Sequence, residues 1–588
     1  MQIKSYRHYV QFFLLIFFPL LTFIQTLDHT FVWDDDIHII HNEYDKPEKP
    51  QNIIKYWSPN PKLIYAPLTY TIWGLVKNDY TGKLNPLPFH LINIVTHILS
   101  VCLIFLILKR MDISSWASFA GAMLFAVHPL QVEAVAWATG LRSLLSGLLG
   151  FAAIWTYLLF REKNSNKLLY TCSLFLFFLS ICAKPSAIIL PAFLFLFDYF
   201  HYKINFKSIF ITLIPYILVT LVFTWILMHT NTQPRYVPPI LHRPLVMADT
   251  INFNLYKIII PLKLCSYYGR TPYYIMQSKW FYLSWIILPV LFWSIIKIKN
   301  KYPVLILALL LFIIGILPLS GLIPFEAQNW NTPADRYLYL SMLGVALSFA
   351  YIIHKWQRKR VIWILAVSIL TFWFLRSLLV QVPQWKNDSS IWNSAISYFP
   401  EHSIPYSKRA EIYLDQGKLD LAMHDYQQAI KRNPNFAKGY NNIGLIYSQR
   451  GEWNNALIAY LRAIQLDGSL TRTYKNIGMI YFIQGEFDKA EQALKNAIKI
   501  DPGYADAYYR LAQVFTSQKK YNESERALKQ TIRLDRNHLR AYIALANLYT
   551  DNHQAKKALE MWQMILILDP ENRQAQNFFL HYQQQKDK

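Results

Sequence analysis

The sequence predicts an all-α protein in two parts: a polytopic transmembrane helix bundle over residues 1–385, and a tetratricopeptide-repeat α-solenoid over residues 386–588. Three observations support this prediction. The chain has 588 residues, too many for one hydrophobic core. Long apolar runs alternate with short basic clusters up to about residue 385, and an ordinary soluble composition follows. The remainder of the sequence repeats itself with a period of about 34 residues.

The first part contains about 11 apolar runs that are candidate membrane spans, since a bilayer core is crossed by about 20 apolar residues of helix. The run at 113–128 and the pair around Lys184 are short for a full span. The N-terminal run follows Lys4 and Arg7 and lacks a small-residue cleavage site, so we expect a retained helix rather than a signal peptide. The predicted spans are residues 8–27, 89–108, 113–128, 142–160, 168–183, 185–200, 209–229, 281–297, 303–318, 337–354 and 361–380.

The charge distribution predicts how the bundle is oriented. The net charge of +23 divides unevenly, because residues 401–588 hold 26 Lys and Arg against 20 Asp and Glu, about +6, which leaves about +17 for residues 1–400. The excess lies in alternate short loops, so it indicates a cytoplasmic N-terminus rather than nucleic-acid binding. With 11 spans, the repeats are then extracytoplasmic. We expect a multi-pass protein, in the inner or plasma membrane if the chain is bacterial.

The second part carries about five tetratricopeptide repeats over residues 403–570, followed by a closing helix. Small residues recur at one position of each repeat and aromatic residues three positions later, while proline often ends the second helix. The small register is Ala410, Gly444, Gly478, Ala512 and Ala546, and the aromatic register is Tyr413, Tyr447, Tyr481, Phe515 and Tyr549. Such arrays offer a groove to peptides or partner helices, so this part is expected to bind a protein rather than to catalyse a reaction.

Acidic residues are scarce in the first 400 positions, which makes the triplet Asp34-Asp35-Asp36 after the first span conspicuous. Adjacent carboxylates beside a membrane raise each other's pKa and suit a general base or a cation site. The alternative is a solvated acidic turn or a helix N-cap, where Asp is favoured.

Two further groups of polar residues flank predicted spans on the same external side. His128, Glu133 and Arg142 form one group, for which interfacial anchoring is an equal alternative. The cations Lys184, Arg235 and Arg336 form the other and suit a phosphate, although contacts with lipid headgroups are the simpler interpretation. No glycine-rich phosphate loop, nucleophile elbow or zinc spacing is present, so we do not expect a nucleotide-dependent active site on the cytoplasmic side. We assign no metal ligands and no resident cofactor.

The order of these motifs resembles a known family. Phe31-Val32-Trp33-Asp34-Asp35 is followed by His128-Pro129-Leu130-Gln131-Val132-Glu133-Ala134-Val135-Ala136-Trp137, then by Lys184-Pro185, Asp335-Arg336-Tyr337 and the repeats. This order is similar to that of the transmembrane and tetratricopeptide-repeat-containing protein O-mannosyltransferases and their bacterial relatives. The resemblance covers nearly the whole chain and implies a membrane fold of the glycosyltransferase C type.

The resemblance also implies a mechanism. A polyprenyl-phosphate sugar, mannose or a similar one, would donate to a hydroxyl of an acceptor protein held at the repeat groove, on the extracytoplasmic face. Asp34 and Asp35 match the family's acidic pair, with Asp35 slightly preferred as the base. His128, Glu133, Arg142, Lys184, Arg235 and Arg336 would bind substrate. A divalent metal is compatible with this reaction but is not implied.

Two other functions remain open at the level of sequence. A non-catalytic scaffold would use the bundle only to anchor the repeats, but a plain anchor needs one helix and no acidic triplet. A transporter of lipid-linked glycan would place charges near the middle of its spans, often within inverted repeats, and neither pattern is evident here.

Overall fold

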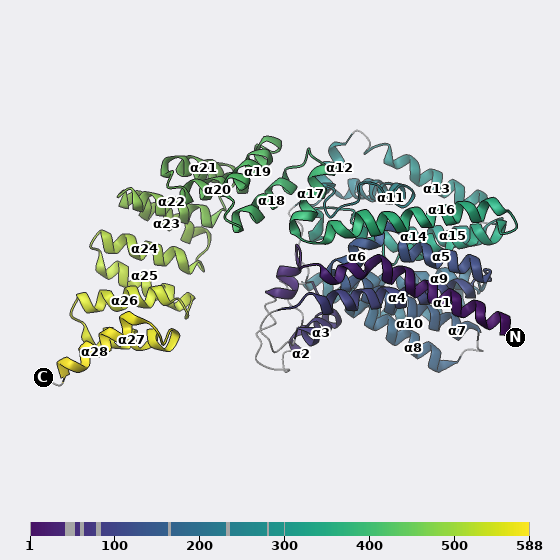
Figure 1. Ribbon diagram of the computed structural model, residues 1–588, viewed down its shortest axis with the longest axis horizontal. Coiled ribbons are helices and arrows are strands. Elements are labelled where there is room, and N and C mark those ends of the chain that lie inside the picture. Colours follow the sequence, from purple (N-terminus) through teal and green to yellow (C-terminus); the bar gives the residue numbers. More distant parts are fainter. Residues whose placement is uncertain are drawn as a thin grey trace. The chain divides into compact units, whose positions relative to one another are not determined.

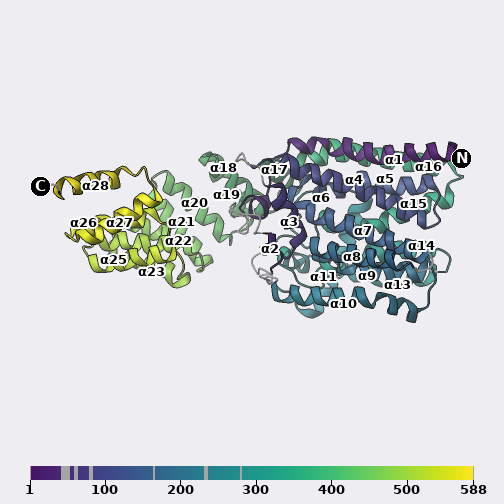
Figure 2. The ribbon, with the colours of Figure 1, turned by 90° about the horizontal axis from the view of Figure 1, so that it is seen from below.

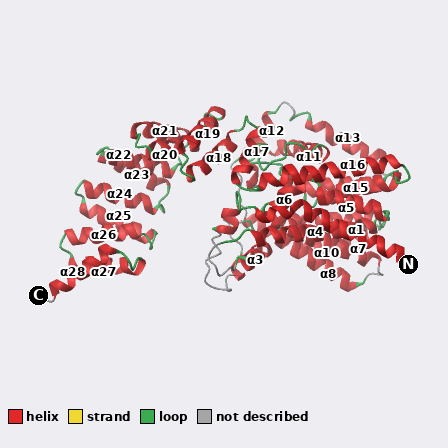
Figure 3. Cartoon of the chain, in the orientation of Figure 1, coloured by secondary structure: helices red, strands yellow, loops and turns green. Residues whose placement is uncertain are grey.

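The computed structural model describes residues 2–41, 53–58, 64–77, 84–162, 166–230, 236–278, 281–298 and 300–586. Helices and connecting loops make up these residues, and the part described contains no strand (Figure 3). The chain divides into two compact units, residues 1–400 and 401–588. The expected boundary at 385/386 precedes a helix, α17 (Asp388–Tyr398), that lies in the first unit.

The first unit is a bundle whose long helices run roughly alongside one another (Figures 1 and 2). Within it, α4 packs on both α5 and α7, and α15 packs on α5. These four helices contain many of the unit's buried side chains. The helices, in chain order, are α1 (Gln2–Phe23), α2 (Ile53–Tyr56), α3 (Pro67–Val76), α4 (Leu87–Arg110), α5 (Ser115–Val127), α6 (Val132–Ala136), α7 (Leu141–Glu162), α8 (Lys167–Ala183), α9 (Leu190–Phe200), α10 (Phe206–Thr230), α11 (Arg243–Ile259), α12 (Pro272–Gln277), α13 (Ser284–Ile298), α14 (Pro303–Ile316), α15 (Met342–Trp356), α16 (Arg360–Arg376) and α17.

Five helical stretches of the described chain are long and apolar enough to cross a membrane. A sixth is possible if the bent pair Ser115–Val127 and Pro129–Ala136 is one span, and four further apolar helices are shorter. Each predicted range does contain a helix, but the expected number of about eleven spans is not confirmed and stays a prediction. The five stretches are Arg7–Asp28, Leu87–Arg110, Ala138–Glu162, Phe206–His229 and Arg360–Trp385.

Close helix contacts in the bundle depend on glycine. A Cβ added at Gly121 would lie 2.6 Å from the backbone oxygen of Ala346, so α5 and α15 can approach each other only because this position lacks a side chain. Gly344 does the same for α14 and α15, where an added Cβ would lie 2.2 Å from the oxygen of Ala308. The two glycines thus allow α5, α14 and α15 to pack closely against one another.

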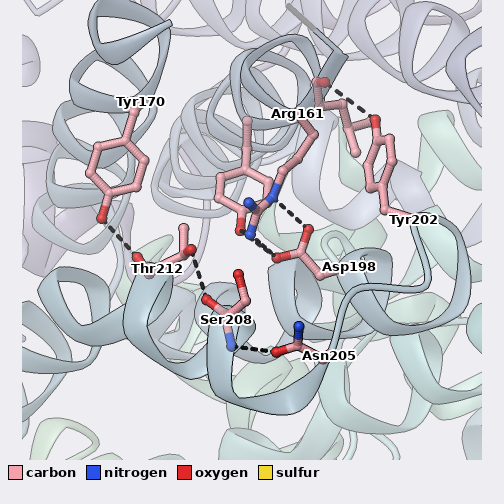
Figure 4. Close-up of polar contacts among 9 residues, drawn as sticks. Arg161, Tyr170, Asp198, Tyr202, Asn205, Ser208 and Thr212 are labelled. Carbon is pink, nitrogen blue, oxygen red and sulfur yellow. Dashed lines mark hydrogen bonds and ion pairs between the residues drawn. The ribbon is translucent and has the colours of Figure 1, made fainter. Parts of the chain in front are cut away.

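A buried ion pair joins the ends of α7 and α9, as Figure 4 shows. Arg161 donates from Nε to Oδ1 of Asp198 over 2.9 Å and pairs a second time through Nη2. The Tyr157 hydroxyl donates to Oδ2 of Asp198 over 2.6 Å, so the carboxylate is fully occupied by its neighbours. On the adjacent α10, the oxygen of Thr212 accepts from the Tyr170 hydroxyl. These contacts indicate a structural role for the cluster, which joins α7 to α9.

The second unit consists of five antiparallel helix pairs and a closing helix, which confirms the predicted repeats. The pairs are α18 (Ser403–Asp415) with α19 (Leu419–Arg432), α20 (Ala437–Gln449) with α21 (Trp453–Leu466), α22 (Thr471–Ile483) with α23 (Phe487–Ile500), α24 (Ala505–Ser517) with α25 (Tyr521–Leu534), and α26 (Leu539–Asp551) with α27 (Ala555–Leu568); α28 (Arg573–Lys586) follows. The small register allows the close packing within each pair: a Cβ at Gly444 or Gly478 would meet Tyr460 or Leu494 at 2.7 Å.

In every repeat, one residue of the turn between the two helices has a left-handed backbone conformation. This repeated position was not identified from the sequence. Gly417, Gly451 and Gly485 have φ values between 71° and 78°, and Lys519 and His553 take the same conformation at 59° and 56°. These five positions recur with the period of the repeats. Glycine adopts this conformation without strain, whereas Lys519 and His553 do so at a cost.

Candidate active site

A short turn after the first span presents the acidic triplet. The Asp35 amide donates to the Val32 oxygen over 3.1 Å, and Trp33, the second residue of this turn, has a φ of +55°. Such a φ is sterically costly for a bulky side chain. The turn therefore has a geometry that neighbouring contacts must maintain, and it places the three carboxylates in three different surroundings.

Asp35 points into the protein and is completely buried. Its Oδ2 accepts from the Val32 amide, and its Oδ1 accepts from both the amide and the hydroxyl of Thr139, which lies just before α7. Burial raises the pKa of Asp35 to about 7, even though these hydrogen bonds favour the carboxylate. Both oxygens are thus occupied, and Asp35 joins the triplet loop to the start of α7.

Asp34 and Asp36 differ from Asp35. Asp34 is half-buried and lies within electrostatic range of the guanidinium groups of Arg142 and Arg336. Asp36 is exposed, and its carboxylate pairs with the exposed ring of His41 over 2.7 Å. Of the three acids, Asp34 is therefore the one that combines partial solvent access with nearby cations.

Glu133 and Arg336, which lie far apart in the sequence, form a buried ion pair. Glu133 lies in α6 and is only 3% exposed, and Arg336 lies in the 3-10 turn Asp335–Leu338. The Arg336 amide also donates to Oε2 of Glu133 over 3.1 Å, so both carboxylate oxygens are engaged. The Arg336 guanidinium lies over the rings of Trp33, Trp137 and Tyr337, at 5.6, 5.1 and 4.8 Å.

Lys184 and Arg142 contribute two further cations beside this pair. Lys184 donates from Nζ to the Ser143 hydroxyl over 2.7 Å and lies 5.3 Å from the Tyr337 ring. Burial, and then the charges of Arg336 and Arg142, lower the pKa of Lys184 to about 7. Arg142 lies 5.9 Å from the Trp73 ring, and its buried Nη1 has no hydrogen-bond partner within the part of the chain that the structure describes.

These residues form a polar cluster with surplus positive charge: the cations Arg142, Lys184 and Arg336 meet the carboxylates Asp34 and Glu133, within walls made by Trp33, Trp73, Trp137 and Tyr337. Because Glu133 is paired with Arg336, the surplus is concentrated on Arg142 and Lys184. A guanidinium with a buried nitrogen that has no hydrogen-bond partner among the described residues, beside a lysine, is suited to an anion such as a phosphate.

The remaining predicted site residues lie elsewhere. His128 is buried; its Nδ1 accepts from the Leu130 amide, its Nε2 donates to the Ile258 oxygen, and its ring packs on Trp373 at 4.4 Å. These contacts give it the role of a helix cap and leave its predicted substrate contact a prediction. Arg235 lies outside the described residues.

Several residues of the cluster were not predicted from the sequence. Thr139 and Ser143 adjoin predicted motifs, and Tyr337 stands within one but was given no role. Asp388 and Trp392 follow the last predicted span and contact Trp33 from the far end of the unit. Asn387-Asp388-Ser389-Ser390 is a helix N-terminal signature, which predicts α17 and says nothing of its contact with the triplet loop.

The fold and the cluster together define a helical membrane protein with a cationic, aromatic-walled polar site and a tetratricopeptide array. The protein O-mannosyl-transferase F38B6.6 of Caenorhabditis elegans is 25% identical over 454 residues, 72% of this chain and 63% of the relative. The human protein O-mannosyl-transferase TMTC4 is 25% identical over 69% of this chain and 64% of its own length, and mouse TMTC3 is 33% identical over 22% and 14%. The chain is therefore related to these transferases, as the motif order predicted, and spans less than two thirds of their length.

The array has its own similarities. The family described as the cilia and flagella-associated protein 70 C-terminal domain matches residues 403–585. Solved structures similar to part of the chain include MamA, 25% identical, with a TM-score of 0.26 and coverage of 28% of this chain and 96% of that one. YrrB, described as a TPR protein with an unusual peptide-binding site, is 18% identical, with a TM-score of 0.28 and coverage of 33% and 99%.

Proposed function

We propose that the chain is a membrane glycosyltransferase of the glycosyltransferase C type, which moves a sugar, mannose or a similar one, from a polyprenyl-phosphate donor to a hydroxyl of an acceptor protein. The observation that carries the proposal is the half-buried cluster of Asp34 with Arg142, Lys184 and Arg336. It combines a carboxylate with surplus positive charge, as transfer from a phosphate leaving group requires. The relatives named as protein O-mannosyl-transferases support the transfer of a sugar to a protein.

Asp34 serves as the general base in this proposal. The acceptor hydroxyl oxygen attacks the anomeric carbon, its proton passes to the Asp34 carboxylate, and the bond between that carbon and the phosphate oxygen breaks. One displacement of this kind inverts the anomeric configuration. We prefer Asp34 to Asp35 because both oxygens of Asp35 accept hydrogen bonds from Val32 and Thr139 inside the protein.

Arg142 and Lys184 hold the phosphate, and Arg336 shapes the site beside them. Arg336 is engaged by Glu133 and by three aromatic rings. Arg142, in contrast, has a buried nitrogen that no described residue pairs with, and Lys184 is bonded to a neutral hydroxyl. A phosphate that forms as the sugar leaves stabilises the charged form of Lys184. The donor is a substrate, and the proposal includes no resident cofactor.

The repeats would recruit the acceptor protein at their groove, and the bundle's lipid contacts would bring the donor to the cluster. On the expected orientation, with the N-terminus in the cytoplasm, transfer takes place on the extracytoplasmic face.

The test is sugar transfer by the full chain in detergent, with a synthetic polyprenyl-phosphate mannose, other polyprenyl-phosphate sugars and a pool of Ser/Thr peptides, followed by mass spectrometry. We expect Asp34→Asn to reduce the rate roughly a thousandfold, because a positioned general base contributes a factor of about 10²–10⁴. Asp36→Asn, which changes the exposed neighbouring acid, is the matched control and should retain the wild-type rate.

Different results would contradict the assignment of Asp34 as the base and the proposed function itself. A rate that survives in Asp34→Asn but disappears in a folded Asp35→Asn protein would assign the base to Asp35. Absence of transfer by the wild-type chain with every sugar would reject the proposed function and favour a scaffold or a transporter.

A further inference from the structure

The last segment of the first unit contacts the loop that carries the acidic triplet, although the two segments come from opposite ends of the unit's sequence. The amide and hydroxyl of Thr30 both donate to the Lys386 oxygen, at 3.1 and 3.3 Å. The Trp33 amide donates to Oδ1 of Asp388 over 2.8 Å. Three hydrogen bonds thus attach the triplet loop to Lys386 and to the first residue of α17.

Aromatic contacts reinforce the attachment. The Trp33 ring stacks on Trp137 at 5.4 Å and meets Trp392 of α17 edge-on at 5.9 Å. Trp385, at the end of the preceding turn, lies 6.0 Å from the same Trp137. Trp33 is therefore held on one side by the segment that carries Glu133 and on the other by α17.

Trp33 needs such support because of its backbone. At a φ of +55° it occupies the second position of the turn from Val32 to Asp35, a position that Gly, Asn and Asp normally fill. A residue of this size adopts that conformation only where its surroundings impose it. The turn it forms separates the acids, directing Asp35 to Thr139 and leaving Asp34 half-buried near Arg142 and Arg336.

Asp388 is not required to begin its own helix. The side chain of the preceding Asn387 caps α17 by accepting from the Ser390 amide over 2.9 Å. The Asp388 carboxylate instead reaches the Trp33 amide on another segment. Its contact across the unit is thus separate from the capping of α17.

We propose that Asp388, with Trp392, is a positioning residue for the transfer reaction: it holds Trp33 in the left-handed conformation and so sets the Asp34 carboxylate against Arg142 and Arg336. The inference rests on the proposed function, since it assigns a consequence for catalysis to a contact distant in the sequence.

The test compares Asp388→Ala with Asp388→Asn in the full chain. The asparagine variant keeps an oxygen that accepts from the Trp33 amide, whereas the alanine variant does not. We expect Asp388→Ala to lower kcat roughly ten- to a hundredfold, as a small displacement of a catalytic group does. Asp388→Asn should stay within a few-fold of wild type. KM for the acceptor peptide and affinity for sugar-free polyprenyl phosphate should change little in both.

Hydrogen exchange of the peptide covering residues 30–36 provides a measurement that does not depend on activity. We expect faster exchange in Asp388→Ala and wild-type protection in Asp388→Asn. Unchanged exchange, or an alanine variant with wild-type kcat, would overturn the inference. So would equal losses of kcat in both variants, because the hydrogen bond would then not be the cause. If the wild-type chain transfers no sugar, the proposed function fails, and the exchange data still report whether Asp388 holds the loop.

Discussion

Charged side chains are used differently in the two units of the chain. In the first unit, Arg336–Glu133, Arg161–Asp198 and Arg270–Asp249 join separate segments, and their carboxylates are 3, 0 and 6% exposed. In the array, pairs such as Lys529–Glu525 lie one turn apart on a single helix, and the lysine is more than half exposed. The array does contain a pair with a buried carboxylate, Arg409–Asp425.

This difference indicates that the first unit depends on buried ion pairs for its geometry, whereas the array does not. Withdrawing two charges from water costs about as much as their attraction returns, so a buried pair contributes more to geometry than to stability. In the first unit such a pair holds the segment that carries Arg336 against the helix that carries Glu133. The array obtains its shape from small residues and aromatic packing, and its exposed pairs contribute about 0–1 kcal/mol each.

Breaking the Glu133–Arg336 pair should have the largest effect. Glu133→Ala leaves a buried guanidinium without its partner, and we expect a loss of roughly 3 kcal/mol in stability together with most of the transfer activity. Asp420→Ala is the control from the array, because Asp420 pairs with Arg450 while 97% exposed. Thermal unfolding in detergent should shift strongly in the first variant and by less than about 1 kcal/mol in the second. Equal shifts would show that both units use ion pairs alike.

The contacts behind this prediction mark the limit of what the sequence revealed. The repeats were predictable because their contacts are local and recur at a constant period, so one pattern specifies five helix pairs. The acidic triplet and the motif around Glu133 were also visible. Their pairing with Thr139, Arg336 and Asp388 was not, because each partner lies in a distant segment and no periodicity connects the segments. The different surroundings of Asp34 and Asp35 depend on the φ of Trp33, which composition does not specify.

The second prediction concerns the buried Asp35 of the first unit and the pH dependence of its contribution to folding stability. The pKa of Asp35 is about 7 in the folded protein, because of burial, and 3.8 in its ordinary state. The folded state binds this proton more tightly than the unfolded chain, so Asp35 favours folding at low pH. That contribution declines by about 1 kcal/mol per pH unit as the pH rises from about 4 to about 7.

Asp35→Asn removes the titration while leaving the surroundings similar. Relative to wild type, this variant should gain stability between about pH 4 and pH 7 and show a constant difference at higher pH. Melting temperatures measured across this range provide the test. Asp36→Asn, which alters the exposed neighbour, should follow wild type throughout. Parallel curves for wild type and Asp35→Asn would mean that Asp35 is not protonated in the folded protein.

The smallest expected effect lies in the turns of the array. Lys519 and His553 occupy the left-handed position that glycine fills in the first three repeats. Lys519→Gly and His553→Gly should each stabilise the array by up to about 1 kcal/mol, because the steric cost of the side chain exceeds the entropy that glycine adds to the unfolded state.

Gly451→Ala is the reverse control and should destabilise the array by a similar amount, since nothing lies within 4 Å of an added Cβ and only the backbone conformation is strained. Thermal unfolding of the full chain measures the change in stability. Hydrogen exchange of the affected helices shows in which repeat the change occurs. A loss of stability in both glycine variants would mean that the Lys519 and His553 side chains make contacts that outweigh the strain of their backbone, and that the five turns are less alike than their common φ indicates.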